Sequence, residues 1–359
     1  MISTRRVAAL CLAVTSGSIW CQQGDSAGPV DASVDVVDAA TPHVCITTAF
    51  ANCHEGWCAV HAGQFQMGSP LDEWGRDLNT EDIIQVTLTR DFLIQQFELT
   101  QRQWTSQGYA PRAGQVVDAG SQNFGDCLGD ECPASNMTWF EAVQFANSLS
   151  TREGRTPCYD LNGCAANGDG TDGGPACGTV KPTSGSVYEC SGYRLPTEAE
   201  WEFAARAGTT TAFYSGTIAA QEGGWTECAN DPNLLKIGWY CVNSPSFLTH
   251  QVGLLAPNAW GLFDTSGNAF EFASDPFQGR YTRTSIDPWQ AMGPSDEPVL
   301  RSGNVFETSS QERSAERLGE SRWIRMYTAG FRLARTLAPN ETWTGSLLPV
   351  PLRATCPPK

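Results

Sequence analysis

The sequence of 359 residues is poor in histidine and in positive charge. It contains 4 His, and 23 Lys and Arg stand against 39 Asp and Glu, which gives a net charge of −16. This balance argues against nucleic acid as a partner, because binding to phosphates requires a basic surface. With so few histidines and no Cys-x-x-Cys pair, zinc is a weak prediction. No Gly-x-Ser-x-Gly motif supports a serine hydrolase.

Long apolar runs are also missing, and the one short apolar stretch lies at the N-terminus after Arg5 and Arg6. This pattern predicts a secretory signal over residues 1–21 and an exported protein of the cell envelope or the extracellular space. In a lipoprotein version of this signal, Cys21 is lipidated and supplies the only membrane link, although Trp20 is unusual before such a cysteine. The small, acidic residues 22–44 predict a disordered linker, and residues 338–359 a Pro-rich tail.

The 14 cysteines fit an exported chain. Removal of Cys11 with the signal and lipidation of Cys21 would leave an even number, which favours disulfides. Cysteines close in sequence suggest three disulfides, and a fourth would join the two ends of the domain. The four cysteines between residues 158 and 190 suggest nested pairing. The pairs are Cys53–Cys58, Cys127–Cys132, Cys228–Cys241 and Cys45–Cys356.

The pattern of elements predicts an α+β fold with little regular secondary structure. Strands are expected within residues 63–69, 85–89 and 92–99, where apolar residues alternate or cluster. Three capping boxes, at Thr100, Thr138 and Thr197, each predict the start of a helix. Residues 209–260 contain many turn residues and little periodicity. The acidic, Gly-rich residues 167–174 are interpreted as a disulfide-held surface insertion, since a calcium loop would need an acid at Thr171.

Residues 258–272 combine turn-forming glycines with large aromatic residues and two acids, Asp264 and Glu271. Glu271 stands between Phe270 and Phe272. On the pattern alone, the favoured interpretation is a strand with Glu271 outside and both Phe inside. The alternative is a carboxylate that points inward to a cation such as Ca²⁺.

The order of motifs resembles the formylglycine-generating-enzyme (sulfatase-modifying-factor) family over about residues 59–336. The most specific stretch is residues 193–208, which includes Arg-Leu-Pro-Thr-Glu-Ala-Glu-Trp. The other motifs are Gly63-x-Phe65-x-Met67-Gly68-Ser69, Met137-Thr-Trp139-x-Glu141, residues 258–271, Arg313-Ser-Ala-x-Arg317 and Gly330-Phe-Arg332. The resemblance implies one domain, placed here at residues 45–337, with a C-type-lectin-like fold.

The resemblance also changes the prediction for residues 264–271. In the family, the matching segment binds a structural Ca²⁺. Carried over position by position, the ligands would be Asp264, the carbonyls of Gly267 and Ala269, and the carboxylate of Glu271. Ca²⁺ then becomes the preferred interpretation of the acid between the two phenylalanines. The family's second calcium site has no clear match.

The active family members hold copper with two thiolates, but the corresponding residues 301–315 contain no cysteine. Glu307 and Glu312 stand nearest to the two thiol positions. Carboxylates do not replace thiolates as ligands of soft Cu(I), so copper is not expected. Another branch of the family uses iron bound by three His, but two or three of the histidines His43, His54 and His61 lie near the N-terminal edge. His250 could supply one ligand, although a surface loop is its favoured interpretation. The simplest interpretation of both glutamates is a solvated loop.

These observations predict a non-catalytic binding protein whose partner is an envelope or extracellular peptide, protein or glycan. The alternative is an oxidoreductase with a changed metal site, in which a hard ion such as Fe²⁺ is held by Glu307 and Glu312. Ser309, Ser310 and Arg313 would line that site.

Overall fold

The computed structural model describes residues 52–110, 127–162, 164, 178–219, 227–244, 246–279, 285–338, 341 and 343. The predicted signal with Cys21, the linker of residues 22–44, the Cys45–Cys356 pair, residues 167–174 and most of the tail lie outside these residues. Among the helices of the described part, none is long and apolar enough to cross a membrane.

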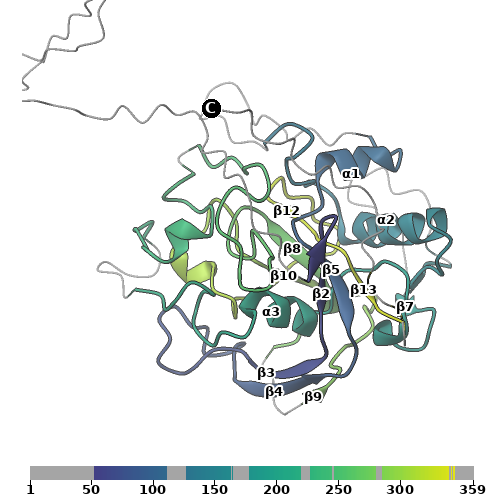
Figure 1. The fold of residues 1–359 in the computed structure, drawn as a ribbon, viewed down its shortest axis with the longest axis horizontal. Coiled ribbons are helices and arrows are strands. Elements are labelled where there is room, and N and C mark those ends of the chain that lie inside the picture. The colour runs from purple at the N-terminus through teal and green to yellow at the C-terminus, as the bar shows by residue number, and fades with distance from the viewer. Residues whose placement is uncertain are drawn as a thin grey trace, which may run out of the picture. The chain divides into compact units, whose positions relative to one another are not determined.

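Short strands form four small sheets in the described residues (Figure 1). The first sheet has the order β1-β2-β5-β13, with bounds Cys53–His54, Trp57–Val60, Phe92–Gln95 and Ala334–Thr336. The second has the order β11-β10-β8-β12, with bounds Leu318–Gly319, Pro298–Arg301, Phe270–Pro276 and Ala329–Gly330. The third has the order β3-β4-β9, with bounds Gly63–Met67, Ile84–Leu88 and Ser285–Ile286. The fourth pairs β6 (Tyr159–Asp160) with β7 (Lys181–Pro182).

The second sheet is covered on both faces. Every residue of β8 is buried, so the inside–outside alternation expected around Glu271 is wrong. β8 pairs antiparallel with β10 and parallel with β12. Strands buried on both faces carry continuous apolar runs, and an acid in such a strand needs a partner inside the protein.

All three predicted helices begin at their capping boxes. α1 (Gln101–Ser106), α2 (Trp139–Arg152) and α3 (Glu198–Arg206) follow Thr100, Thr138 and Thr197, and each threonine accepts a hydrogen bond from the backbone N–H three residues on. Three short 3₁₀ turns are η1 (Val187–Glu189), η2 (Leu234–Lys236) and η3 (Ser309–Gln311). Residues 209–260 form only one of these turns in their described part, as their sequence predicts.

α3 lies between sheets and is buried over its whole length. It contacts β3 on one side and β8 and β10 on the other (Figure 1). Phe203 packs against Phe65 and Trp260, with ring centroids 5.1 and 4.9 Å apart. A helix with no solvent face has no place for unpaired charges, yet α3 carries three glutamates. Each of these buried carboxylates therefore needs a positively charged partner inside the protein.

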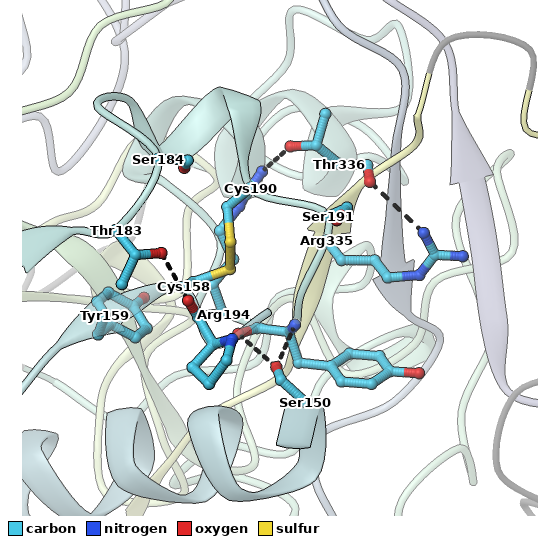
Figure 2. Close-up of a disulfide and its surroundings, with 12 residues drawn as sticks. Ser150, Cys158, Tyr159, Thr183, Ser184, Cys190, Ser191, Arg194, Arg335 and Thr336 are labelled. Atoms are coloured by element: carbon cyan, nitrogen blue, oxygen red, sulfur yellow. Dashed lines mark hydrogen bonds between the residues drawn. A yellow bond between two sulfur atoms is a disulfide. The ribbon is translucent and has the colours of Figure 1, made fainter. Parts of the chain in front are cut away.

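Four disulfides lie within the described residues, and three are the predicted near-neighbour pairs Cys53–Cys58, Cys127–Cys132 and Cys228–Cys241. The fourth, Cys158–Cys190, joins the outer two cysteines of the group expected to nest (Figure 2). Its neighbourhood is fastened by backbone hydrogen bonds from Thr183 to Cys158 (2.9 Å) and from Thr336 to Cys190 (3.2 Å). The disulfide therefore joins the segment after α2 to Cys190, whose carbonyl accepts the hydrogen bond from strand β13.

Candidate functional site

The segment that follows β10 turns sharply at Ser302 and Gly303, which have φ angles of 84° and 74°. The Ser302 hydroxyl donates to the carbonyls of Asp264 (3.2 Å) and Gly267 (3.0 Å). In return, the Gly267 N–H donates to the Ser302 carbonyl at 2.7 Å. The turn thus fixes the segment carrying Glu307 and Glu312 against the loop that carries the predicted calcium ligands.

Glu312 is fully buried, so its interpretation as a solvated loop residue is wrong. One carboxylate oxygen, Oε1, accepts from the Asn304 N–H at 3.1 Å, and no donor among the described residues reaches the other oxygen, Oε2. The backbone of Gly303 lies against this carboxylate, since a Cβ at Gly303 would lie 2.2 Å from Oε2. Burial, followed by the charge of Glu307, holds the pKa of Glu312 well above its usual value.

Glu307 lies half-buried beside a group of aromatic rings, and burial raises its pKa as well. Its carbonyl accepts from the Cys241 N–H at 3.2 Å. The neighbouring Phe306 stacks on Phe247 with centroids 4.9 Å apart, and meets Tyr327 edge-on at 5.6 Å. These three half-buried residues, Phe247, Phe306 and Tyr327, are called the aromatic cluster below. The cluster offers rigid, partly exposed contact area next to an acid.

The structure directs Arg313 away from this site, so the expectation that it lines the site is wrong. The guanidinium of Arg313 is buried and makes two hydrogen bonds to Glu81, of 2.7 and 2.8 Å. It also reaches Glu73 at 2.9 Å and Glu316 at 2.7 Å. Arg313 therefore fastens the segment to residues 73–81 and leaves Glu312 without a cation from its direct neighbour in sequence.

Glu271 points inward, and its counter-charge in the structure is Arg332. Both residues are fully buried, and the guanidinium donates to Oε2 through Nε and to Oε1 through Nη2, each at 2.6 Å. The Trp201 indole also donates to Oε2, at 2.8 Å. The ion pair explains the acid between Phe270 and Phe272. A calcium ion at the predicted ligands would have to share this carboxylate with Arg332.

A further acid at this place, Glu98, was missed by sequence reasoning. It is buried and accepts from the Asn268 side chain (2.7 Å) and the Ala269 N–H (3.0 Å). Burial, and then the charges of Asp264 and Glu271, hold its pKa well above the usual value. No local pattern distinguishes Glu98, which precedes a capping box. Its partners lie about 170 residues further on, beyond the reach of periodicity arguments.

The histidines of the described residues are not brought together. His54 and His61 are exposed near the first sheet. His250 is half-buried, stacks on Trp239 with centroids 3.7 Å apart, and hydrogen-bonds Ser244 at 2.8 Å. Burial lowers the pKa of His250 to about 4. Within the described part of the chain, no group of three or more His, Cys, Asp or Glu side chains is arranged to hold a metal ion.

The described residues thus define a disulfide-rich α+β domain with little regular secondary structure, of the C-type-lectin-like class. The chain belongs to the formylglycine-generating-enzyme family, whose sulfatase-modifying factor enzyme 1-like domain matches residues 47–337. The resemblance drawn from the sequence is therefore confirmed.

Individual relatives agree with this assignment. The chain is 30% identical over 191 residues to the chaperone protein LppX of Paenibacillus barcinonensis, covering 52% of this chain and 62% of that protein, less than two thirds of its length. It is 27% identical over 270 residues to the formylglycine-generating enzyme of Streptomyces coelicolor, covering 70% of this chain and 79% of the enzyme. Among solved structures, Treponema denticola variable protein 1 is similar, with a TM-score of 0.58, 27% identity and coverage of 77% and 93%.

Proposed function

We propose that this chain is an exported member of the family that acts by binding a partner and does not use thiolate–copper oxidation. The supporting observation concerns the cysteines. Each of the nine cysteines in the described residues is disulfide-bonded, and Glu307 and Glu312 stand nearest to the two positions that the family resemblance assigns to copper thiolates. Soft Cu(I) requires thiolate or thioether ligands, and a disulfide sulfur cannot supply a thiolate. The likeness to a relative named as a chaperone favours a binding role.

The aromatic cluster and Glu307 form the binding surface in this proposal. Half-exposed aromatic rings supply contact area at a low cost in side-chain entropy, and they pair well with apolar side chains or with the faces of sugars. The partner is an envelope or extracellular peptide, protein or glycan, as the predicted export implies.

A structural calcium ion at Asp264, Gly267, Ala269 and Glu271 is part of the proposal. Its support is that three buried acids, Glu98, Asp264 and Glu271, all act on the buried guanidinium of Arg332. Carboxylate and backbone carbonyl oxygens are the ligands that a hard cation such as Ca²⁺ prefers. The ion has a structural role here and takes no part in chemistry.

The first test is a copper and oxidation assay on the mature protein with its disulfides intact. After exposure to Cu(I) and dialysis, we expect well under one copper per chain by mass spectrometry. We also expect no aldehyde in a cysteine-containing sulfatase-motif peptide incubated with oxygen. The Streptomyces coelicolor enzyme serves as the positive control. One bound copper per chain, or an oxidised peptide, would refute the proposal.

The second test addresses the binding surface. The mature protein and its Phe306→Ala variant would be applied to glycan and peptide arrays, with Phe65→Ala as a control for an aromatic change far from the cluster. We expect ligands retained by wild type and by Phe65→Ala to be lost by Phe306→Ala. Equal retention by all three proteins would remove the aromatic cluster from the proposal.

A further inference from the structure

The strand β3 is the longest of the edge strands that the structure describes. It has five residues, whereas the other edge strands, β1, β13, β11, β12, β9, β6 and β7, have two or three each. Its neighbour is β4, with which it pairs in an unbroken antiparallel register (Figure 1). The Gln85 side chain of β4 also donates to the Phe65 carbonyl, at 3.0 Å. Within the described part of the chain, no strand pairs with the other side of β3, so that side presents backbone groups to a further strand.

β3 carries none of the features that usually prevent pairing at such an edge. Those features are short length, bulges, proline and charged side chains, above all lysine. The sequence of β3 is Gly-Gln-Phe-Gln-Met, without proline or charge. Gln64 and Gln66 are exposed, and the Phe65 ring is half-exposed although Phe203 of α3 packs on it at 5.1 Å. An accessible, regular edge of this kind is suited to the addition of another strand.

A second copy of β3 matches this edge. In an antiparallel pair centred on Phe65, all five residues find a partner, and the exposed faces of the two strands stay on the same side. Gln64 of one copy then lies opposite Gln66 of the other, and each side-chain amide offers both a donor and an acceptor. On the other face, Phe65 lies opposite its own counterpart, which is an aromatic pair of the kind that stabilises neighbouring strands. A two-fold interface requires a self-complementary surface, and β3 provides one.

The charge of the chain favours this place of contact. With a net charge of −16, two copies repel each other over much of their surface. Like charges directly opposite one another also destabilise a pair of strands. Pairing through β3 brings only uncharged side chains together, so it avoids that local repulsion.

We propose that β3 pairs antiparallel with β3 of a second copy of this chain, which joins two three-stranded sheets into one and makes a homodimer. Five residues from each copy form a small contact, so the dimer dissociates on dilution. The pairing uses no residue of the aromatic cluster and does not rest on the proposed binding role. The two proposals therefore fail separately.

The test is an exchange of charge across the contact. The double variant Gln64→Glu/Gln66→Glu places like charges opposite one another twice in each dimer, and Gln64→Lys/Gln66→Lys does the same with the other sign. A mixture of the two variants places unlike charges opposite one another. The full-length proteins, with disulfides intact, would be followed by analytical ultracentrifugation over a dilution series. We expect each variant alone to associate roughly ten-fold more weakly than wild type or worse, and the equimolar mixture to recover the wild-type association.

The matched control is Ile286→Glu, because Ile286 is exposed on β9 at the other edge of the same sheet. It should associate as wild type does. Recovery in the mixture also excludes a folding artefact, since misfolded variants would not be restored by mixing. The proposal is wrong if wild type is monomeric at every concentration, or if the charged variants associate as wild type does. It is equally wrong if the mixture stays monomeric, or if Ile286→Glu weakens association as much as the glutamate variant.

Discussion

Replacement of Glu271 by Gln tests whether the ion pair with Arg332 is what holds the buried sheet together. Both partners are fully buried, with two hydrogen bonds of 2.6 Å between them and one of 2.8 Å from Trp201. Removing one charge of a buried pair costs about 3–5 kcal/mol, because the other charge is left uncompensated. Gln keeps one acceptor, so we expect about 3 kcal/mol. For a domain of this length that lowers Tm by roughly 6 °C.

A double-mutant cycle with Arg332→Met isolates the pair. Since the double variant leaves no unpaired charge in the core, it should be more stable than Glu271→Gln alone. The melts would be followed by circular dichroism in chelator and in millimolar Ca²⁺. A larger loss for Glu271→Gln in Ca²⁺ than in chelator would add calcium as a second partner of the carboxylate. If Glu271→Gln stays within about 1 kcal/mol of wild type in both buffers, or the cycle shows no coupling, the reasoning about this ion pair fails.

Three further perturbations follow from single contacts. Burial alone would raise the pKa of Glu81, but the hydrogen bonds and charge of Arg313 outweigh it and lower the pKa from its ordinary 4.5 to about 2. The stability that ionised Glu81 contributes is therefore fully present above pH 4.5 and is lost as the pH falls toward 2. Between these pH values, the melting temperature of Glu81→Gln should change less with pH than that of wild type. Gly267→Ala places a Cβ 2.3 Å from a backbone carbonyl oxygen at a φ of 84°, so a loss of about 2 kcal/mol or more should appear in thermal melts. Replacing Cys158 and Cys190 with Ala opens a loop of 32 residues, and should cost about 4 kcal/mol against about 2 for either disulfide with a separation of 5. Equal melting temperatures for the two kinds of disulfide variant would contradict the loop-length argument.

Features that depend on nearby residues could be predicted from the sequence. Each of the three helices begins after a threonine that forms a capping box with the residue three positions further on. Both residues of the box lie within four consecutive positions of the sequence. The disulfides Cys53–Cys58 and Cys127–Cys132 were accessible for the same reason, because a separation of 5 leaves few alternatives. Local chemistry determines such features, and later packing does not overturn them.

Features that depend on distant partners could not be predicted. The strand around Glu271 alternates acid and aromatic in sequence, but its outer face is not solvated, because α3 packs on it and Trp201 donates to Glu271. Its partner Arg332 lies 61 residues away. Glu312 and Arg313 are adjacent, yet the Glu312 carboxylate accepts from the Asn304 N–H and the Arg313 guanidinium reaches a cluster of three acids. Nothing in the sequence around these two residues predicts that their side chains point to different parts of the molecule.

The motif that identifies the family has a structural explanation in this chain. Its three glutamates on α3 are all buried and paired with arginines. Glu200 pairs with Arg194 of the same motif, whereas Glu198 and Glu202 both reach Arg301 of β10. Buried ion pairs of this kind add little net stability but are costly to leave half-made, so they fix which segments pack together. This fold has few long strands or helices. Its buried ion pairs therefore help to position segments that hydrogen bonds between backbone groups position in other folds. The buried ion pairs of residues 194–206 therefore account for the motif by the fold alone.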